Sequence, residues 1–173
     1  LLAWLSAFLC NRTQRVVVEN CMSKESKVIS GVPQGSVSGP ILFIMYINCI
    51  GSVCSGSTKY SLFADDLKLY SVVDVISGTG GTSDLQLSID NLAIWARDWQ
   101  LDINIEKCLV LGVRGFTRST SNAAHSYFIN GIVLCRFNSV RDLGVVVDSS
   151  LSYKTQINNC FTKAYQRTGV LFH

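Results

Sequence analysis

The chain has 173 residues, of which 48% are hydrophobic and 16% charged, against roughly 25% charged in an average globular domain. This composition excludes a disordered or strongly acidic protein, and the length allows one buried core with little room for two independent domains. Fifteen basic residues against 12 acidic ones give a formal charge of +3, which permits a polyanionic partner without requiring one.

Cysteine and histidine usage gives no pattern typical of a zinc site. The cysteines form no Cys-x-x-Cys pair, and neither His125 nor His173 has the spacing to them that zinc ligands show. We therefore predict no zinc site and reduced, mostly buried thiols at Cys10, Cys21, Cys49, Cys54, Cys108, Cys135 and Cys160.

The apolar segments are short. The longest uninterrupted apolar run, residues 41–47, is far too short to span a bilayer. Residues 1–10 lack the initiator Met and basic region of a signal peptide. Both ends of the chain carry helix-like patterns, so we expect a fragment of a longer polypeptide without a membrane segment.

The N-terminal third predicts a helix, a hairpin and a second helix. Apolar residues recur at helical spacing over residues 1–9, and the β-branched runs 12–19 and 27–30 suit a strand pair. Residues 31–36, within a stretch that has no charge, predict an ordered turn. Residues 41–50 predict an almost wholly apolar helix that is buried on most sides.

The middle of the chain predicts two strands and a long helix. Residues 59–70 alternate in polarity on both sides of Asp65 and Asp66, as expected of two strands that meet at these acids. Residues 77–83 are predicted to be a flexible linker, since no Gly-Lys-Ser/Thr follows to make a phosphate-binding loop. A capping box at Ser83 would start the next helix, and its apolar face includes Trp95 and Trp99.

The C-terminal third predicts further strands and a final helix. A strand over residues 109–113 and a polar loop over 115–126 precede a hairpin over 127–134, turned at an Asn-Gly pair. Residues 143–147 predict another strand. The chain then closes in a helix with one apolar side.

Asp65 and Asp66 are the residues that most directly suggest chemistry. Adjacent carboxylates at the junction of two strands repel each other unless a cation lies between them. Mg²⁺ prefers such oxygen ligands and is often held by one or two carboxylates together with substrate phosphates. The alternative is a solvated turn, because Asp is common in turns.

The motifs around the two acids resemble the reverse transcriptases of non-LTR, LINE-type retrotransposons, especially the jockey-like elements. The first motifs that carry the resemblance are Gly31-Val32-Pro33-Gln34-Gly35-Ser36, Gly39-Pro40-Ile41-Leu42-Phe43, Tyr46-Ile47-Asn48 and Phe63-Ala64-Asp65-Asp66. The later ones are the Trp95 and Trp99 helix leading to Leu101, Asn104 and Lys107, and Val140-Arg141-Asp142-Leu143-Gly144-Val145 with Leu151-Ser152-Tyr153. Leu5 to Val18 is also similar to the family, so the resemblance covers essentially the whole chain.

The resemblance implies an α+β fold, a right-hand polymerase palm with partial fingers and the start of the thumb. Residues 1–113 would form the partial fingers and palm with the acidic hairpin, and residues 114–173 the end of the palm and the beginning of the thumb. The implied activity is RNA-directed DNA synthesis by two-metal nucleotidyl transfer. Its implied cofactor is Mg²⁺, and its partners are an RNA template, a DNA primer and deoxynucleoside triphosphates.

The resemblance also implies roles for residues near the acids. Asp65 and Asp66 would be catalytic metal ligands, with Asp65 the more direct one. Phe63 and Ala64 would face the primer end.

Further roles are implied for residues elsewhere in the chain. Gln34 and Gly35 would line the nucleotide and template side, where a glycine backbone lets a substrate approach closely. Lys107 would lie near the triphosphate as a catalytic acid for the departing pyrophosphate, the alternative being an ordinary exposed lysine.

The last helix carries the basic residues Lys154, Lys163 and Arg167. They are candidates for binding the nucleic-acid backbone. The alternative is a solvated charged face, which is the usual reading of such residues on a helix.

One departure from the family pattern concerns the metal site. The third catalytic carboxylate of the family comes from an earlier palm strand, and the only acids before Asp65 are Glu19 and Glu25, neither of which occupies that motif. We therefore expect that the first palm strand and the sugar-selecting residue are missing, and that this chain alone does not polymerise. Ser38 and Cys49 stand where the family usually carries Leu and Asp, which suggests relaxed selection.

Two functions from different classes follow from these motifs. The first is a fragment of a retrotransposon RNA-directed DNA polymerase, with a viral or intron-encoded polymerase as the less favoured enzyme. The second is a non-catalytic retroelement remnant that is inert or binds nucleic acid weakly. Either protein is expected to be intracellular, and no localisation signal distinguishes nucleus from cytoplasm.

Overall fold

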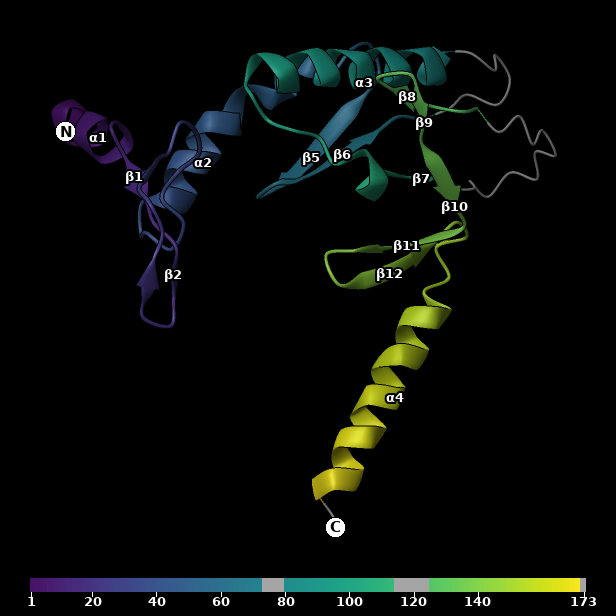
Figure 1. Ribbon diagram of the computed structural model, residues 1–173. Coiled ribbons are helices and arrows are strands. Elements are labelled where there is room, and N and C mark those ends of the chain that lie inside the picture. The colour runs from purple at the N-terminus through teal and green to yellow at the C-terminus, as the bar shows by residue number, and fades with distance from the viewer. Residues whose placement is uncertain (73–79, 114–124, 172–173) are drawn as a thin grey trace. The chain divides into compact units, whose positions relative to one another are not determined.

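The computed structural model describes residues 1–72, 80–113 and 125–171 (Figure 1). Helices and strands are mixed along the chain, which confirms the predicted α+β class. The chain divides into two compact units, Leu1–Gly51 and Ser52–His173. The predicted boundary between residues 113 and 114 separates parts of a polymerase and stays a prediction.

The first unit contains a helix and two short strand pairs. Helix α1 (Leu2–Leu9) is followed by β1 (Thr13–Gln14), which pairs antiparallel with β4 (Ser26–Lys27). Between them, β2 (Val17–Val18) pairs with β3 (Cys21–Met22). The predicted pairing of the two β-branched runs is therefore confirmed at β1 and β4.

Helix α2 (Gly39–Ile47) ends this unit and continues into the 3₁₀ helix η1 (Asn48–Val53). The prediction that this apolar helix is buried on most sides is wrong, because only Gly39 and Ile47 in α2 are buried. Met45 is 68% exposed. The strands of this unit are two residues long and offer no sheet that could cover more of the helix.

The second unit begins with the predicted pair of strands. Strands β5 (Lys59–Phe63) and β6 (Asp66–Tyr70) pair antiparallel along their full length. Helix α3 (Gly80–Asp98) packs beside this hairpin, as Figure 1 shows. The predicted strands on both sides of the acids are confirmed.

Helix α3 begins earlier than predicted. It starts at Gly80, so the predicted linker is wrong for residues 80–83 and so is the capping box at Ser83; residues 77–79 lie outside the described residues. Hydrogen bonds from another segment explain the early start: the Asp84 carboxylate accepts the Ser57 N–H at 2.8 Å, and the Ser88 hydroxyl accepts the Ser55 N–H at 2.9 Å. These contacts hold the first turns despite the low helix propensity of glycine.

Three further strand pairs follow. After the 3₁₀ helix η2 (Ile105–Lys107), β7 (Leu109–Leu111) pairs in parallel with β10 (Cys135–Phe137). Strands β8 (Phe128–Ile129) and β9 (Ile132–Val133) form the predicted hairpin. Its turn residues Asn130 and Gly131 have φ values of 51° and 78°, as a tight Asn-Gly hairpin turn requires.

The last hairpin leads into a long helix. Strands β11 (Ser139–Asp142) and β12 (Val145–Asp148) pair antiparallel, and helix α4 (Lys154–Leu171) follows. The predicted strand begins two residues later than expected because Leu143 and Gly144, with φ values of 45° and 87°, form the turn. The predicted polar loop over residues 115–126 falls almost entirely outside the described residues.

The core of the second unit consists of Ile89, Tyr127 and Ile129, surrounded by partly buried apolar side chains. Trp95 and Trp99 are half-buried and stack with their ring centroids 5.7 Å apart. Among the described residues, no helix combines the length and the apolar character that crossing a membrane requires.

All seven cysteines are free thiols, as predicted. The prediction that most of them are buried is wrong, because five are exposed and only Cys54 and Cys108 are half-buried. Burial raises the pKa of these two thiols. The exposed cysteines lie largely on short strands and helices that few other elements cover.

Replacement of the most buried core isoleucine tests this description. Ile129 is 2% exposed, and Ile129→Ala is expected to lower the free energy of unfolding by about 2–5 kcal/mol because it leaves a cavity. Ile132, in the same hairpin, is 54% exposed, and Ile132→Ala is expected to cost less than about 1 kcal/mol. Urea unfolding of both variants makes the comparison, and equal costs would contradict the assignment of the core.

Candidate functional site

The two acids lie at the turn of the β5–β6 hairpin. Phe63 pairs with Asp66, so Ala64 and Asp65 form a two-residue loop. Ala64 has a φ of 51°, a left-handed conformation that is uncommon for a residue with a β-carbon. All four residues are exposed. The sharp turn therefore presents both carboxylates to solvent at the tip of a hairpin.

The two faces of this hairpin differ in character. Cross-strand partners share a face, so Phe63 and Asp66 lie with the pair Ser61 and Lys68 on one side. The neighbouring residue Leu69 packs against the core that contains Ile89. Since a slip of one residue would exchange the faces, this apolar contact fixes which side presents the acids.

An ion pair links the acidic hairpin to the next part of the unit. The Lys68 ammonium on β6 lies 2.6 Å from the Asp142 carboxylate on β11. The two side chains are 40% and 35% exposed, so the pair contributes at most about 1 kcal/mol. The pair links β6 to β11, and no local pattern in the sequence indicates this link.

Asp65 and Asp66 suit a divalent cation as part of a ligand set. Carboxylate oxygens are the ligands that Mg²⁺ prefers, and this ion commonly keeps several waters and takes only one or two protein carboxylates. Within the described residues, no group of three or more His, Cys, Asp or Glu side chains is arranged to hold a metal ion. The pair therefore fits such an ion together with ligands from another source.

The turn before α2 carries the predicted substrate residues Gln34 and Gly35. Both are exposed, and Gly35 has a φ of 81°, which favours glycine. The Ser36 hydroxyl donates to the Pro33 carbonyl at 2.7 Å and accepts the Gly39 N–H at 3.0 Å. These bonds make the turn an ordered entry to the helix, as predicted.

Arg12 braces this turn, and its role was not predicted from the sequence. Its guanidinium donates to the Leu9 carbonyl at 2.9 Å and to the carbonyls of Ser30 and Gly31. One side chain thus connects the end of α1 with the start of the turn. Only the folded chain reveals this role, because 19 residues separate Arg12 from Gly31.

Lys107 lies at the end of η2 and is exposed. The Asn104 side chain caps this turn by accepting the Lys107 N–H at 3.3 Å. The hydrogen bonds and ion pairs of the described residues do not connect Lys107 with the acidic hairpin. Its catalytic role stays a prediction.

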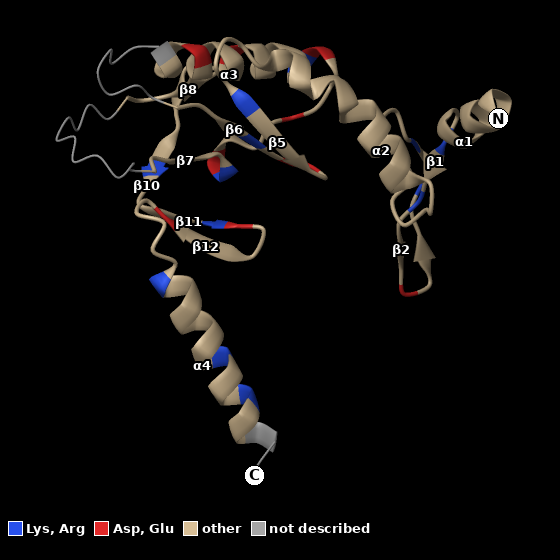
Figure 2. Ribbon diagram, turned by 180° about the vertical axis from the view of Figure 1, so that it is seen from behind, with Lys and Arg blue, Asp and Glu red and all other residues tan. Residues whose placement is uncertain are grey.

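The predicted nucleic-acid-binding residues lie along α4, where Figure 2 shows its basic positions. Lys163 and Arg167 are four residues apart and share one side of the helix. Lys154, at the first position of the helix, is nine residues before Lys163 and points to the opposite side. The structure therefore brings two of the three together.

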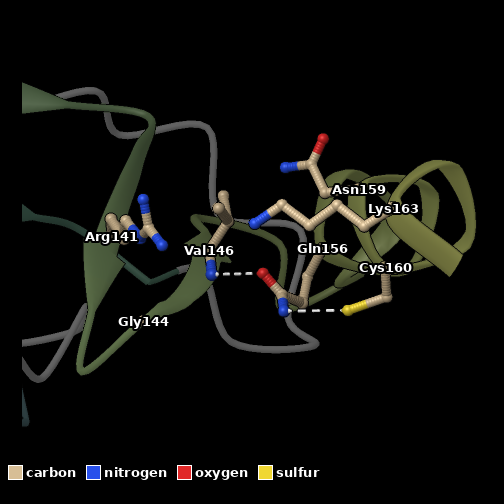
Figure 3. A pocket seen from close by; sticks show the side chains of 7 residues that line it. All are labelled: Arg141, Gly144, Val146, Gln156, Asn159, Cys160 and Lys163. Carbon is tan, nitrogen blue, oxygen red and sulfur yellow. Dashed lines mark hydrogen bonds between the residues drawn. The ribbon is translucent and has the colours of Figure 1, made fainter. Parts of the chain in front are cut away.

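A small pocket lies between the β11–β12 hairpin and α4 (Figure 3). Its volume is about 80 Å³, and it contains two cationic side chains, Arg141 and Lys163. Gln156 connects its two walls, because its side-chain oxygen accepts the Val146 N–H at 2.9 Å. Arg141 was not among the predicted binding residues, since nothing in the sequence indicates that the β11–β12 hairpin lies beside α4.

The junction between β12 and α4, residues 149–153, is held by one carboxylate. Asp148 accepts the N–H groups of Ser150 at 2.9 Å, Ser152 at 3.1 Å and Tyr153 at 2.9 Å. It also accepts the hydroxyls of Ser150 and Ser152. An Asp followed by closely spaced serines is typical of such a turn, so this signal could have been found in the sequence.

These hydrogen bonds, that from the Ser150 hydroxyl foremost, hold the pKa of Asp148 well below its ordinary value of 3.8. Hydrogen bonds of this kind stabilise the charged form of a carboxyl group. The carboxylate of Asp148 is therefore a permanent part of the junction at neutral pH.

Comparison with known proteins identifies the family. Residues 1–146 match the model of the family described as reverse transcriptase (RNA-dependent DNA polymerase). Because the match covers most of the chain, the chain belongs to the reverse transcriptase family, as the motifs around Asp65 and Asp66 predicted. No solved structure matches the chain.

The chain is also similar to polymerases of insect mobile elements. It is 27% identical over 161 residues to the RNA-directed DNA polymerase from mobile element jockey of Drosophila funebris, and 28% identical over 161 residues to that of Drosophila melanogaster. It is 27% identical over 174 residues to the probable RNA-directed DNA polymerase from transposon BS of Drosophila melanogaster. The matches cover 90–94% of this chain and 17–18% of the relatives.

The lowered pKa of Asp148 predicts how stability depends on pH. A carboxyl group whose pKa falls on folding contributes stability that is complete above its unfolded-state pKa and is lost as the pH falls through the folded-state value. The difference in unfolding free energy between wild type and Asp148→Ala is therefore expected to stay constant from neutral pH down to about pH 4 and then to shrink. Urea unfolding over this range measures it, and a difference that disappears by about pH 5.5 would contradict the assignment.

Proposed function

We propose that the chain forms the palm, with partial fingers and the start of the thumb, of a retrotransposon RNA-directed DNA polymerase. Residues 1–113 would contribute the fingers and palm, and residues 114–173 the end of the palm and the start of the thumb. The observation that carries the proposal is the hairpin tip, where Asp65 and Asp66 are exposed side by side while the opposite face of the hairpin packs on the core. Family membership and the similarity to the polymerases of jockey elements support it.

The proposed reaction is attack of a primer hydroxyl on the innermost phosphate of a deoxynucleoside triphosphate, with pyrophosphate leaving. Asp65 and Asp66 would hold Mg²⁺, which when bound stabilises the charge on the attacking and leaving oxygens. Phe63 and Ala64 would face the primer end, as their place directly before the acids suggests. A water-exposed turn alone would not need two adjacent carboxylates, which repel each other.

Three other predicted residues, Gln34, Gly35 and Lys107, would lie near the nucleotide. The exposed backbone of Gly35 has no β-carbon, so it allows close approach of the base or template, with Gln34 beside it. Lys107 would donate a proton to the departing pyrophosphate. The RNA template and DNA primer would run past the basic side of α4, and the protein would act inside the cell.

Substitution of the first acid tests the proposed catalytic role. In a polypeptide that also carries the upstream palm strand with the third carboxylate, Asp65→Asn is expected to reduce Mg²⁺-dependent primer extension on RNA by at least about 10³-fold. The matched control is Asp98→Asn, because Asp98 is an exposed acid at the end of α3 that forms an ion pair with the adjacent Arg97, away from the acidic hairpin.

Primer extension by the control variant and by the 173-residue chain completes this test. The Asp98→Asn variant is expected to retain full extension activity, while the 173-residue chain by itself is expected to show none, because its described residues contain no group of three metal ligands. Undiminished activity of Asp65→Asn would refute the metal role of this acid.

A second function, that of a non-catalytic remnant that binds nucleic acid, is favoured by the paired cations of α4. Lys163 and Arg167 lie on one side of this exposed helix. Phosphate contacts release counterions, so affinity falls steeply as salt rises.

The remnant function predicts salt-dependent binding by the chain alone. Each phosphate contact is expected to add about 0.9 to the slope of log K against log salt for a primer–template duplex. Fluorescence anisotropy with a labelled duplex measures this slope. Absence of binding at low salt would contradict this function, and Lys154→Gln, on the other side of the helix, is the control that should leave the slope nearly unchanged.

A further inference from the structure

The junction after β12 fixes the direction in which α4 leaves the hairpin. Asp148 accepts three backbone N–H groups within the next five residues. Leu151 and Tyr153 have φ values of 52° and 55°, conformations that side chains with a β-carbon adopt only when their surroundings hold them. The Asp148 carboxylate supplies that restraint.

The same junction is closed by two further contacts. The Ser149 N–H donates to the Asn138 carbonyl at 2.8 Å, which ties the junction to the residue before β11. On the other side, Gln156 in the first turn of α4 accepts the Val146 N–H of β12. The junction is therefore held at three places, and Asp148 makes the largest number of these hydrogen bonds.

The pocket between the β11–β12 hairpin and α4 is lined by two cationic side chains. Lys163 extends from α4 toward the hairpin that carries Arg141, and both line the same pocket (Figure 3). The other lining residues carry no acid: they are Gly144, Val146, Gln156, Asn159 and Cys160. Two cations without an acid among the lining residues favour a bound anion, and Arg and Lys bind phosphate oxygens through strong charge-assisted hydrogen bonds.

We propose that Asp148 is a positioning residue for nucleic-acid binding, which holds α4 so that Lys163 faces Arg141 and the two cations together bind one phosphate of the primer–template backbone. The proposal rests on the proposed function and adds Arg141 and the pocket to it. Asp148 itself is negative and does not contact the phosphate. It acts through the direction of the helix.

The sign of the charge effect makes this proposal testable. Removal of an acid by itself strengthens binding to a polyanion, whereas loss of the positioning carboxylate weakens it. Asp148→Ala is therefore expected to raise the Kd of the 173-residue chain for a primer–template duplex about three- to tenfold. Asp98→Ala removes the same charge from the exposed end of α3 and is expected to leave the Kd unchanged or slightly lower.

A double-mutant cycle separates positioning from a general loss of stability. Lys163→Gln is expected to reduce the slope of log K against log salt by about 1 in the wild-type background and to change it little in the Asp148→Ala background. Arg141→Gln is expected to behave as Lys163→Gln does. Additive effects of Asp148→Ala and Lys163→Gln, or tighter binding by Asp148→Ala, would overturn the proposal.

A more conservative variant keeps the test valid if Asp148→Ala unfolds the junction. Asp148→Asn retains one acceptor oxygen for Ser150 and loses the acceptor for the Ser152 hydroxyl and the Tyr153 N–H. It is expected to weaken binding about two- to threefold, with unchanged helix content by circular dichroism. Unchanged Kd in this folded variant would overturn the positioning role. Absence of duplex binding by the wild-type chain would instead overturn the proposed nucleic-acid function.

Discussion

The packing of the β5–β6 hairpin against α3 is the interaction on which the described site depends. Leu69 joins the core formed by Ile89, Tyr127 and Ile129, so one face of the hairpin is held in an apolar environment. Side chains alternate between faces along a strand, so this contact also decides which residues point away from the core.

Asp66 and Lys68 share the opposite face of the hairpin. The Lys68–Asp142 ion pair links this face to β11. Without the apolar contact, neither face of the hairpin would be held toward the core, and the acids at its tip would have no defined orientation.

Besides the small core, hydrogen bonds from polar side chains hold several junctions between helices and strands. Arg12 braces the turn before α2 through backbone carbonyls, Asp84 and Ser88 anchor the start of α3, and Asp148 holds the junction before α4. Each of these side chains satisfies backbone or hydroxyl groups that would otherwise depend on water. Two of these restraints also adjoin segments to which we assign a role in binding: Arg12 bonds the start of the turn that carries Gln34 and Gly35, and Asp148 holds the junction directly before α4.

Much of the local structure could be predicted, and the failures have a common cause. The two strands around Asp65, the Asn130-Gly131 turn and the final helix depend on patterns within a few residues, and the structure has all three. The start of α3 at Gly80 and the exposure of α2 were missed. Both depend on contacts, or on the lack of them, with residues far away in the sequence. Local propensity favours a linker at the glycines, but hydrogen bonds from residues 55–57 hold a helix there.

The sequence by itself determined the family and the residues that would carry its chemistry. The order and spacing of Gly31 to Ser36 and Phe63 to Asp66 were enough for the family, because these motifs are short and local in the chain and can be identified without knowledge of the fold. The tertiary structure alone decided how these residues are held and which cations meet: Lys163 joins Arg141 at a pocket, while Lys154 points away. The physical reason is that the ion pair of Lys68, the bonds of Arg12 and the pocket join groups from separate elements, and such pairings arise only when the chain folds.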